Sequence, residues 1–157
     1  MNFLKRDDEF FMNVALAEAR KAFEKDEVPV GAVIVLNEKI IAKAHNQVEL
    51  LHDATAHAEM LVITQASAAL KNWRLSEATI YVTKEPCPMC AGAMINSRIK
   101  KLVYGLSDPQ GGAAGSALSI TNHKGLLHTV EVVSEVLPNE SLELLQSFFK
   151  KKRVQNN

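Results

Sequence analysis

The N-terminal part of the chain carries apolar residues at a helical period. Six of them recur on one helix face, namely Met12, Ala15, Leu16, Ala19, Ala22 and Phe23. Asp7 or Asp8 is expected to cap this helix, because a short acidic side chain can accept hydrogen bonds from the first free N–H groups. Val28-Pro29 disfavours helical backbone. The pattern therefore predicts one helix that ends before Val28-Pro29.

Two apolar runs follow this helix. Residues 32–36 and 40–44 consist largely of Ala, Val, Ile and Leu. Asn37-Glu38, which separates them, is typical of a turn. This combination predicts an antiparallel β-hairpin.

A strand, a helix and a second strand are expected in succession between residues 79 and 105. Residues 79–83 and 101–105 are short, largely apolar runs, and a helix is expected from about residue 87 to residue 96 between them. This order indicates a crossover between parallel strands. The segment that begins at Cys87 would then follow the carboxyl end of a strand, where α/β sheets bind ligands.

The remaining segments predict a loop, a strand and a helix. Residues 105–125 are Gly-rich and polar and are expected to loop over a site, while residues 129–136 predict a last strand and residues 141–153 a last helix. No repeat or linker interrupts the 157 residues, of which 47% are hydrophobic and 23% charged. We therefore expect one α/β domain over residues 1–157, large enough to bury roughly 70% of its unfolded surface.

Two short motifs combine three metal ligands with a spare carboxylate. The first is His57-Ala58-Glu59, and the second is Pro86-Cys87-Pro88-Met89-Cys90. A structural zinc site uses four protein ligands, whereas a catalytic site uses three and leaves the fourth position to water. Only three ligands cluster here, so the motifs indicate a hydrolytic zinc site formed by His57, Cys87 and Cys90.

The spacing within each motif places both at helix N-termini. Cys87 and Cys90 are three positions apart and share one helix face, and a helix N-terminus favours thiolate over thiol. His57 and Glu59 are two positions apart and would point to opposite sides within a helix. They can meet one metal-bound water only at a helix end.

Glu59 is the expected proton shuttle of this site. We expect Asp53 or Thr55 to cap its helix, with His57 in the first turn. Two thiolates and a neutral imidazole leave a zinc centre formally neutral, so its water is less acidic than in a three-histidine site. A base is then needed. Glu59 would take the water proton and pass it first to a ring nitrogen and then to departing ammonia.

Each motif alone has a simpler explanation. H-x-E arises easily by chance, and C-x-x-C could be a redox pair or half of a zinc knuckle. A redox pair does not need His57 and Glu59 upstream, however, and a structural site has no use for Glu59. The two motifs together favour catalysis.

Charge and targeting signals narrow the setting. Eighteen Lys and Arg balance eighteen Asp and Glu, so composition by itself does not indicate a nucleic-acid-binding protein. The first eight residues turn acidic before a signal peptide could form, and no apolar run reaches the ~18 residues of a membrane span. Both cysteines are assigned to the metal, and thiolate ligands suit a reducing compartment. We expect a cytoplasmic protein with no membrane partner.

Further motifs surround the metal ligands. They lie at residues 28–33, Asn46, 55–59, 85–94, 97–99, Asp108 and 112–116. With H-x-E and P-C-x-x-C, the signature of zinc nucleobase deaminases, they make nearly the whole chain resemble the bacterial tRNA-specific adenosine deaminases of the cytidine deaminase-like superfamily. Guanine, cytosine and dCMP deaminases share the zinc motifs, whereas the 108–116 loop and the 148–153 tail resemble the tRNA branch. The resemblance implies a three-layer α/β/α fold around a mixed sheet of about five strands.

The resemblance also implies a substrate and a set of contacts. It implies deamination of adenosine to inosine at the wobble position of an arginine tRNA, in the anticodon stem-loop, by a homodimer with one Zn²⁺ per subunit. By similarity, Asn46 would hydrogen-bond the purine edge, backbone groups near Val30 and Ala56 would line the base pocket, and Asp108 would contact the ribose. Taken without the resemblance, Asn46 reads as a turn residue and Asp108 as a loop cap.

Some positions depart from the family pattern. Ala54 stands where a proline is expected, Lys84 replaces a leucine-like residue, and residues 109–111 vary the nucleic-acid loop. These departures bear on the approach to His57 and on tRNA contacts near Gln110, not on the zinc chemistry.

The C-terminal segment combines an apolar stripe with a basic end. Leu142, Leu145, Phe148 and Phe149 keep helical spacing, and Lys150, Lys151, Lys152 and Arg153 follow. The structural explanation is a packed amphipathic helix whose cations complement the helix dipole. The functional explanation is that Phe149 and the four cations contact the phosphates of tRNA.

Other aromatic and imidazole side chains carry weaker signals. His45, His52, His123 and His128 lie in polar contexts and are mostly expected at the surface, although His45 or His52 could stack on an anticodon base. Trp73 is expected to be a packing residue.

Two alternative functions remain open at this point. One is deamination of a free nucleobase or nucleotide of the guanine, cytosine or dCMP type. The other is a zinc-stabilised RNA-binding module without turnover, against which Glu59 and the missing fourth ligand speak.

Overall fold

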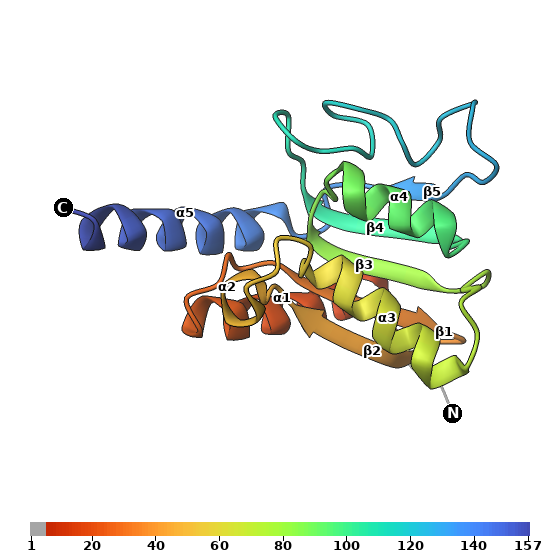
Figure 1. The fold of residues 1–157 in the computed structure, drawn as a ribbon, viewed down its shortest axis with the longest axis horizontal. Helices are drawn as coiled ribbons and strands as arrows, with labels where there is room; N and C mark the ends of the chain where they lie inside the picture. Colours follow the sequence, from red (N-terminus) through yellow and green to blue (C-terminus); the bar gives the residue numbers. More distant parts are fainter. Residues whose placement is uncertain (1–5) are drawn as a thin grey trace.

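The computed structural model describes residues 6–157, which form a five-stranded mixed sheet with helices on both faces (Figure 1). The strands are β1 (Gly31–Leu36), β2 (Lys39–His45), β3 (Thr79–Lys84), β4 (Lys101–Leu106) and β5 (Glu131–Val133). Their order is β2-β1-β3-β4-β5. β1 pairs antiparallel with β2 and with β3, whereas β3–β4 and β4–β5 are parallel. The predicted hairpin and parallel crossover are confirmed.

The helices form an outer layer on each side of the sheet. They are α1 (Asp8–Glu24), α2 (Val48–Leu51), α3 (Ala58–Leu70), α4 (Pro88–Asn96) and α5 (Pro138–Gln155). α3 packs on β1 and β2 and contacts α4, while α1 packs on the opposite face and contacts α5 (Figure 1). The three-layer α/β/α fold is therefore confirmed.

β1 is buried on both faces, which explains its continuous apolar run. Ala32 and Ile34 belong to the core under α3 and α4, whereas Val33 and Val35 belong to the core under α1. Alternate residues of a strand point to opposite faces, so each layer receives every second side chain. The strand begins with Gly31, and glycine is needed at this position because a Cβ would lie 2.0 Å from the Ala15 carbonyl oxygen of α1.

The ends of two elements differ from expectation. β5 has three residues rather than the eight of residues 129–136, because it is an edge strand and the Val130 N–H is already bonded to the Thr121 carbonyl at 2.8 Å. α5 begins at Pro138, earlier than residue 141, because proline has no N–H to lose in a first turn. The N-terminal prediction is confirmed: Asp7 caps α1 and accepts a hydrogen bond from the Phe10 N–H at 2.9 Å.

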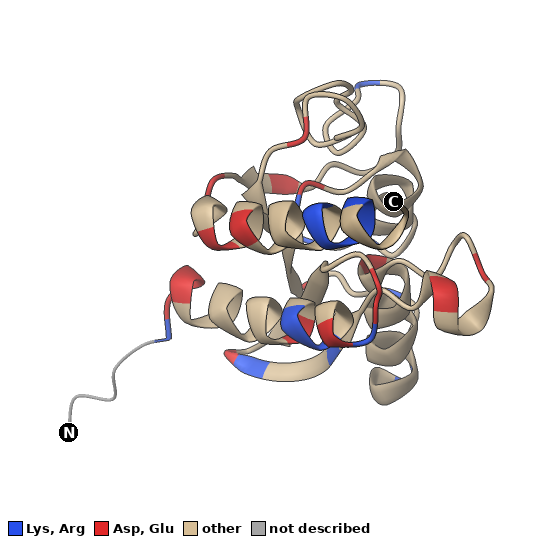
Figure 2. Ribbon diagram, turned by 90° about the vertical axis from the view of Figure 1, so that its left-hand side faces the viewer, with Lys and Arg blue, Asp and Glu red and all other residues tan. Residues whose placement is uncertain are grey.

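The C-terminal turns of α5 extend beyond the end of the sheet (Figure 1). α5 runs beside α1, and its last turns contain a group of basic residues, coloured blue in Figure 2. Lys151 and Lys152 Nζ lie 3.4 and 3.7 Å from Asp26 Oδ1, in the connection between α1 and β1. This end of the molecule therefore brings residues from both ends of the chain together.

Candidate metal centre and active site

Three side chains from two helix N-termini converge at one point. His57 is the N-cap residue of α3, Cys87 is the N-cap residue of α4, and Cys90 lies in the first turn of α4. Their ligand atoms all lie within 4.8 Å of one another, and each sulfur is 3.6 Å from His57 Nδ1. The predicted meeting of the two motifs at helix ends is confirmed.

The cap of α3 was assigned to the wrong residue from sequence. The Asp53 carboxylate accepts from the Thr55 N–H and hydroxyl at 2.8 and 2.7 Å, which closes a turn before the helix, and His57 takes the cap position. The Ala58 N–H at the start of the helix is bonded by Asn46 Oδ1 at 2.7 Å. A side chain twelve residues upstream therefore replaces the local cap.

The donor set fits a tetrahedral zinc ion. Bond lengths of ~2.3 Å to sulfur and ~2.05 Å to nitrogen place a tetrahedral sulfur–nitrogen pair about 3.5 Å apart. Both sulfur–nitrogen distances here are 3.6 Å. A set of two thiols and one imidazole also binds zinc in preference to hard cations, which favour oxygen ligands. The site can therefore hold zinc with three protein ligands.

Burial concentrates titratable groups around this centre. The neighbouring Cys90 thiol and His57 lower the pKa of Cys87 to about 4, while the neighbouring Cys87 sulfur and burial raise the pKa of Cys90. Burial raises the pKa of Glu59, whose Oε2 accepts a hydrogen bond from the Cys90 thiol at 3.3 Å. A divalent cation would oppose both increases, because it binds thiolate and stabilises neighbouring negative charge. Glu59 thus lies beside the candidate metal ligands, within hydrogen-bonding distance of Cys90.

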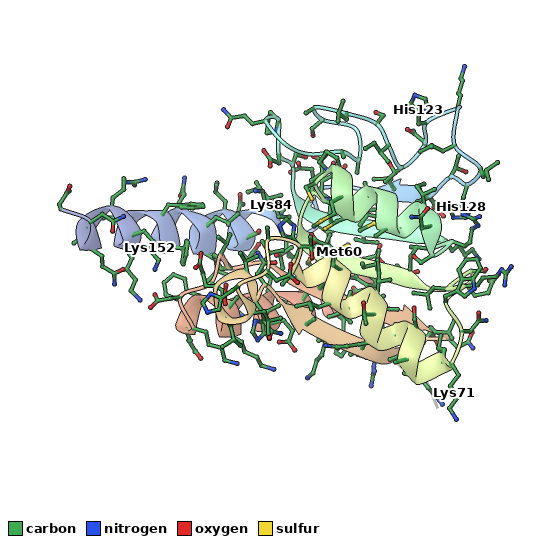
Figure 3. The ribbon with its side chains drawn as sticks, viewed as in Figure 1. Met60, Lys71, Lys84, His123, His128 and Lys152 are labelled. Atoms are coloured by element: carbon green, nitrogen blue, oxygen red, sulfur yellow. The ribbon has the colours of Figure 1, made fainter. Side chains whose placement is uncertain are left out.

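A cavity of about 1070 Å³ opens from this centre. It is lined by most of the site residues predicted from the sequence, namely Val30, Asn46, His57, Glu59, Cys87, Asp108, Phe149 and Lys152. Lys84 and Met60 lie at the same end of the sheet as α5, whereas Lys71 and His128 lie at the opposite end (Figure 3). The cavity therefore joins the metal ligands to the projecting helix.

Ala56 is placed differently from the other candidate contacts. It is buried and does not line the cavity. Its N–H donates to the Asp53 carbonyl and its carbonyl accepts from Gln47, both within the chain. The Val30 N–H likewise donates to the Val28 carbonyl, although Val30 does border the cavity. Neither N–H is free to bind a base.

The Asp108 side chain is occupied by one partner in its own loop and one at the end of β3. Oδ2 lies 3.2 Å from Lys84 Nζ, and Oδ1 accepts from the Gln110 N–H at 3.1 Å. Partial burial opposes ionisation, but the Gln110 N–H and the Lys84 ammonium outweigh it and lower the pKa of Asp108. Lys84, one of the departures from the family pattern, is thus the ionic partner of Asp108.

The basic tail is divided between two surfaces. Lys151 and Lys152 pair with Asp26. Lys150 and Arg153 line a second hollow on α5 that Phe149 also borders, and within residues 6–157 no carboxylate pairs with either of them. The four cations do not form one uniform patch.

Two of the weaker expectations were wrong. His45 is buried, and its Nδ1 lies 3.0 Å from the Asn46 carbonyl oxygen, so it cannot stack on a base. Trp73 is 51% exposed and lies under the Arg74 guanidinium, 4.2 Å from its ring centroid, rather than in the core.

Sequence reasoning missed two buried carboxylates at the cavity. Glu27 accepts hydrogen bonds from the Glu49 and Leu50 N–H groups, both at 2.9 Å, and so holds α2. Glu85 accepts from the loop that contains Asp108. Glu85 lies in the motif at residues 85–94, but nothing in the local sequence pattern indicates hydrogen-bond partners more than twenty residues away.

Comparison with known proteins identifies the family. The profile described as MafB19-like deaminase matches residues 6–153. The tRNA-specific adenosine deaminase of Bacillus subtilis (strain 168) is 51% identical over 146 residues, which cover 93% of this chain and 91% of the relative. This chain belongs to the tRNA-specific adenosine deaminase family. It is an enzyme, a deaminase that acts on a carbon–nitrogen bond.

Solved structures agree with this family assignment. One comes from biochemical and structural studies of A-to-I editing by tRNA:A34 deaminases at the wobble position of transfer RNA. It is 47% identical to the present chain and superimposes with a TM-score of 0.83. The match covers 86% of the present chain and 98% of the solved one. A guanine deaminase from Nitrosomonas europaea has a TM-score of 0.78 at 24% identity, and the match covers 94% of the present chain and 86% of the guanine deaminase. The second likeness concerns the fold alone.

Within residues 6–157, no helix combines the length and the apolar character needed to span a lipid bilayer.

Proposed function

We propose that this deaminase converts adenosine to inosine at the wobble position of tRNA, with an arginine tRNA as substrate. One observation carries the proposal: the cavity of about 1070 Å³ runs from His57 and Glu59 to Phe149 and Lys152 on α5. A pocket for a free base needs only the inner part of this space. An aromatic ring and a cation at its outer part suit flanking nucleotides, which bind by stacking and through phosphate.

We further propose that His57, Cys87 and Cys90 hold one Zn²⁺ per subunit. When bound, zinc would supply the Lewis acidity that makes water a nucleophile near neutral pH. The protein keeps these ligands at helix N-termini, where the partial positive charge favours thiolate. Both cysteines must stay reduced for this role, which favours the cytoplasm.

Glu59 is the proposed general acid and base. A thiol that binds zinc loses its proton, so the carboxylate 3.3 Å from Cys90 Sγ is left as a free acceptor. It would take a proton from water, give it to a ring nitrogen and assist the departure of ammonia. Adenosine and water thus yield inosine and ammonia.

Asn46 is proposed to orient the purine. Its Oδ1 is committed to the Ala58 N–H, so only the Nδ2 donor is left to face an acceptor on the base edge. Val30 would form an apolar wall, and Ala56 would support the pocket from behind. Asp108 would accept from a ribose hydroxyl while paired with Lys84.

The remaining proposals concern assembly and extent. We propose that residues 1–157 form a single domain, that two copies form a homodimer, and that Phe149 and the cations 150–153 contact the anticodon stem-loop. The family relationship and the position of α5 beside the cavity support them.

The substrate is tested with a matched panel. An anticodon hairpin with adenosine at the wobble position is expected to react with a kcat/KM at least ~10²-fold above free adenosine, because flanking nucleotides position the base. Inosine formation is measured for this hairpin, for free adenosine, guanine and cytidine, and for a hairpin with another anticodon sequence. Guanine or cytidine turnover at comparable efficiency would instead favour a free-base deaminase. Equal rates on both hairpins would contradict the arginine-tRNA proposal.

The basic tail is tested through the salt dependence of tRNA binding. A Lys150→Gln/Arg153→Gln variant should weaken binding and reduce the slope of log K against log salt by about 2, roughly one for each phosphate that is no longer neutralised. Lys151 and Lys152 are left in place because their exchange would also break the pairs with Asp26.

The control for this experiment changes net charge equally at a distance. Lys39→Gln/Lys71→Gln removes two cations, and Lys71 lies at the far end of the molecule (Figure 3). It should leave the slope unchanged. An unchanged slope in the α5 variant as well would return Lys150 and Arg153 to a purely structural role.

A further inference from the structure

The loop that follows β4 borders the active-site cavity. Asp108 is its residue in the cavity wall, which Lys84 and Cys87 also line. Apart from an isolated bridge between Ala114 and Ser119, no helix or strand is found between residues 107 and 130. The conformation of this wall must therefore come from specific contacts rather than from regular structure.

One buried carboxylate provides most of these contacts. Glu85 Oε1 accepts from the Asp108 N–H at 3.0 Å and from the Ser116 hydroxyl. Oε2 accepts from the Ala114 and Ser116 N–H groups at 3.0 and 3.2 Å. Four donors from three loop residues thus converge on one side chain that is 3% exposed.

Only an ionised carboxylate can satisfy this arrangement. Each of its oxygens accepts two hydrogen bonds, whereas an amide offers one oxygen and turns an NH₂ group toward the other donors. The loop also closes tightly around the carboxylate. A Cβ on Gly112 would lie 2.3 Å from Glu85 Cδ, so glycine is needed where the backbone passes the side chain.

Glu85 lies on the segment that carries a metal ligand. Its N–H donates to the Leu106 carbonyl at 2.8 Å, and the Ala113 N–H donates to the Pro86 carbonyl at 2.8 Å. Cys87 is two residues further along. The same short segment therefore holds the loop on one side and the metal centre on the other.

We propose that Glu85 is a positioning residue that sets the 107–116 wall of the cavity and thereby determines affinity for an extended RNA substrate. It is not a catalytic residue, because its oxygens are turned into the loop and bind no reacting atom. The inference rests on the proposed tRNA substrate. It predicts that loss of the carboxylate changes KM and leaves the chemistry at His57, Cys90 and Glu59 intact.

The test is Glu85→Gln in the zinc-loaded protein, with Glu77→Gln as control. Glu77 is exposed and pairs with Lys100 on the surface, so its exchange removes the same charge without touching the loop. In Glu85→Gln, KM for the anticodon hairpin should rise roughly tenfold, since at least two donors lose their acceptor. The kcat should stay within about threefold and zinc content unchanged. The control should match the unmodified protein.

Hydrogen exchange provides a second measurement that does not depend on activity. The Asp108, Ala114 and Ser116 amides should exchange at least about tenfold faster in Glu85→Gln, while the amides of β3 keep their protection. Ser116→Ala removes one side-chain donor, keeps the carboxylate and the three backbone donors, and should give a smaller change in the same direction.

Two results would overturn the proposal. One is unchanged exchange in the loop of both variants, and the other is a fall in kcat or zinc content with KM unaltered. If the unmodified enzyme failed to act on the hairpin, the proposed function would fail, but the exchange data would still decide what Glu85 does to the loop.

Discussion

Glu59→Ala is expected to retain zinc and lose turnover by ~10²- to 10⁴-fold or more, because one group serves several proton transfers. The carboxylate is buried and its Oε2 lies 3.3 Å from Cys90 Sγ, whereas the ligand group found within residues 6–157, which is His57, Cys87 and Cys90, contains no carboxylate itself. Water cannot easily replace it, since a replacement must accept and return a proton at one place. The measurement is single-turnover inosine formation on the wobble hairpin, with zinc content determined for the same sample.

Glu59→Gln separates proton transfer from packing. Glutamine keeps the volume and can still donate or accept hydrogen bonds in the cavity, but it cannot take up a proton. We expect it to be as inactive as the alanine variant and to bind the hairpin with near-normal affinity. Substantial recovery of turnover in Glu59→Gln would show that the carboxylate acts by packing, and the proposed mechanism would then be wrong. Both variants would behave alike in a non-catalytic RNA-binding module, whose unmodified form produces no inosine.

The parts of the structure that could be predicted are those governed by local rules. The apolar period of residues 12–23 and the runs around Asn37-Glu38 gave α1 and the hairpin, because burial of one helix face or of alternate strand residues leaves a local pattern. The metal ligands were equally accessible. Three donors and a carboxylate at fixed spacing reflect the chemistry of the ion, not the surrounding fold.

What could not be predicted depends on contacts between distant residues. Asn46 caps α3 from twelve positions upstream, so the local rule chose Asp53 or Thr55 instead. Glu85 bonds a loop up to 31 residues away, and Asp26 pairs with Lys151 across 125 positions. Hydrogen bonds and ion pairs of this kind leave no period in the sequence, because one residue on each side is enough to form them.

Cys87→Ala is expected to remove zinc and to lower the Tm by about 10 °C. Cys87 begins α4 and His57 begins α3, so the ion would tie together two helices that pack on one face of the sheet. Binding to the folded state alone adds to its stability, and structural zinc in finger peptides contributes ~10–16 kcal/mol. A loss of ~3–4 kcal/mol, at roughly 2–4 °C per kcal/mol in a chain of this size, lowers the Tm by about 6–16 °C.

A chelator provides the matched control, because both cysteines of the chain belong to the site. Chelation should lower the Tm of the unmodified enzyme to near that of Cys87→Ala and leave the variant unchanged, since both treatments remove the same interaction and cannot add. The readouts are calorimetry and elemental analysis. Zinc undiminished in the variant would exclude Cys87 as a ligand. A chelator that removed zinc from the unmodified enzyme without lowering its Tm, while Cys87→Ala did lower it, would show that the ion contributes little to joining α3 and α4 and that the thiol stabilises the protein through packing.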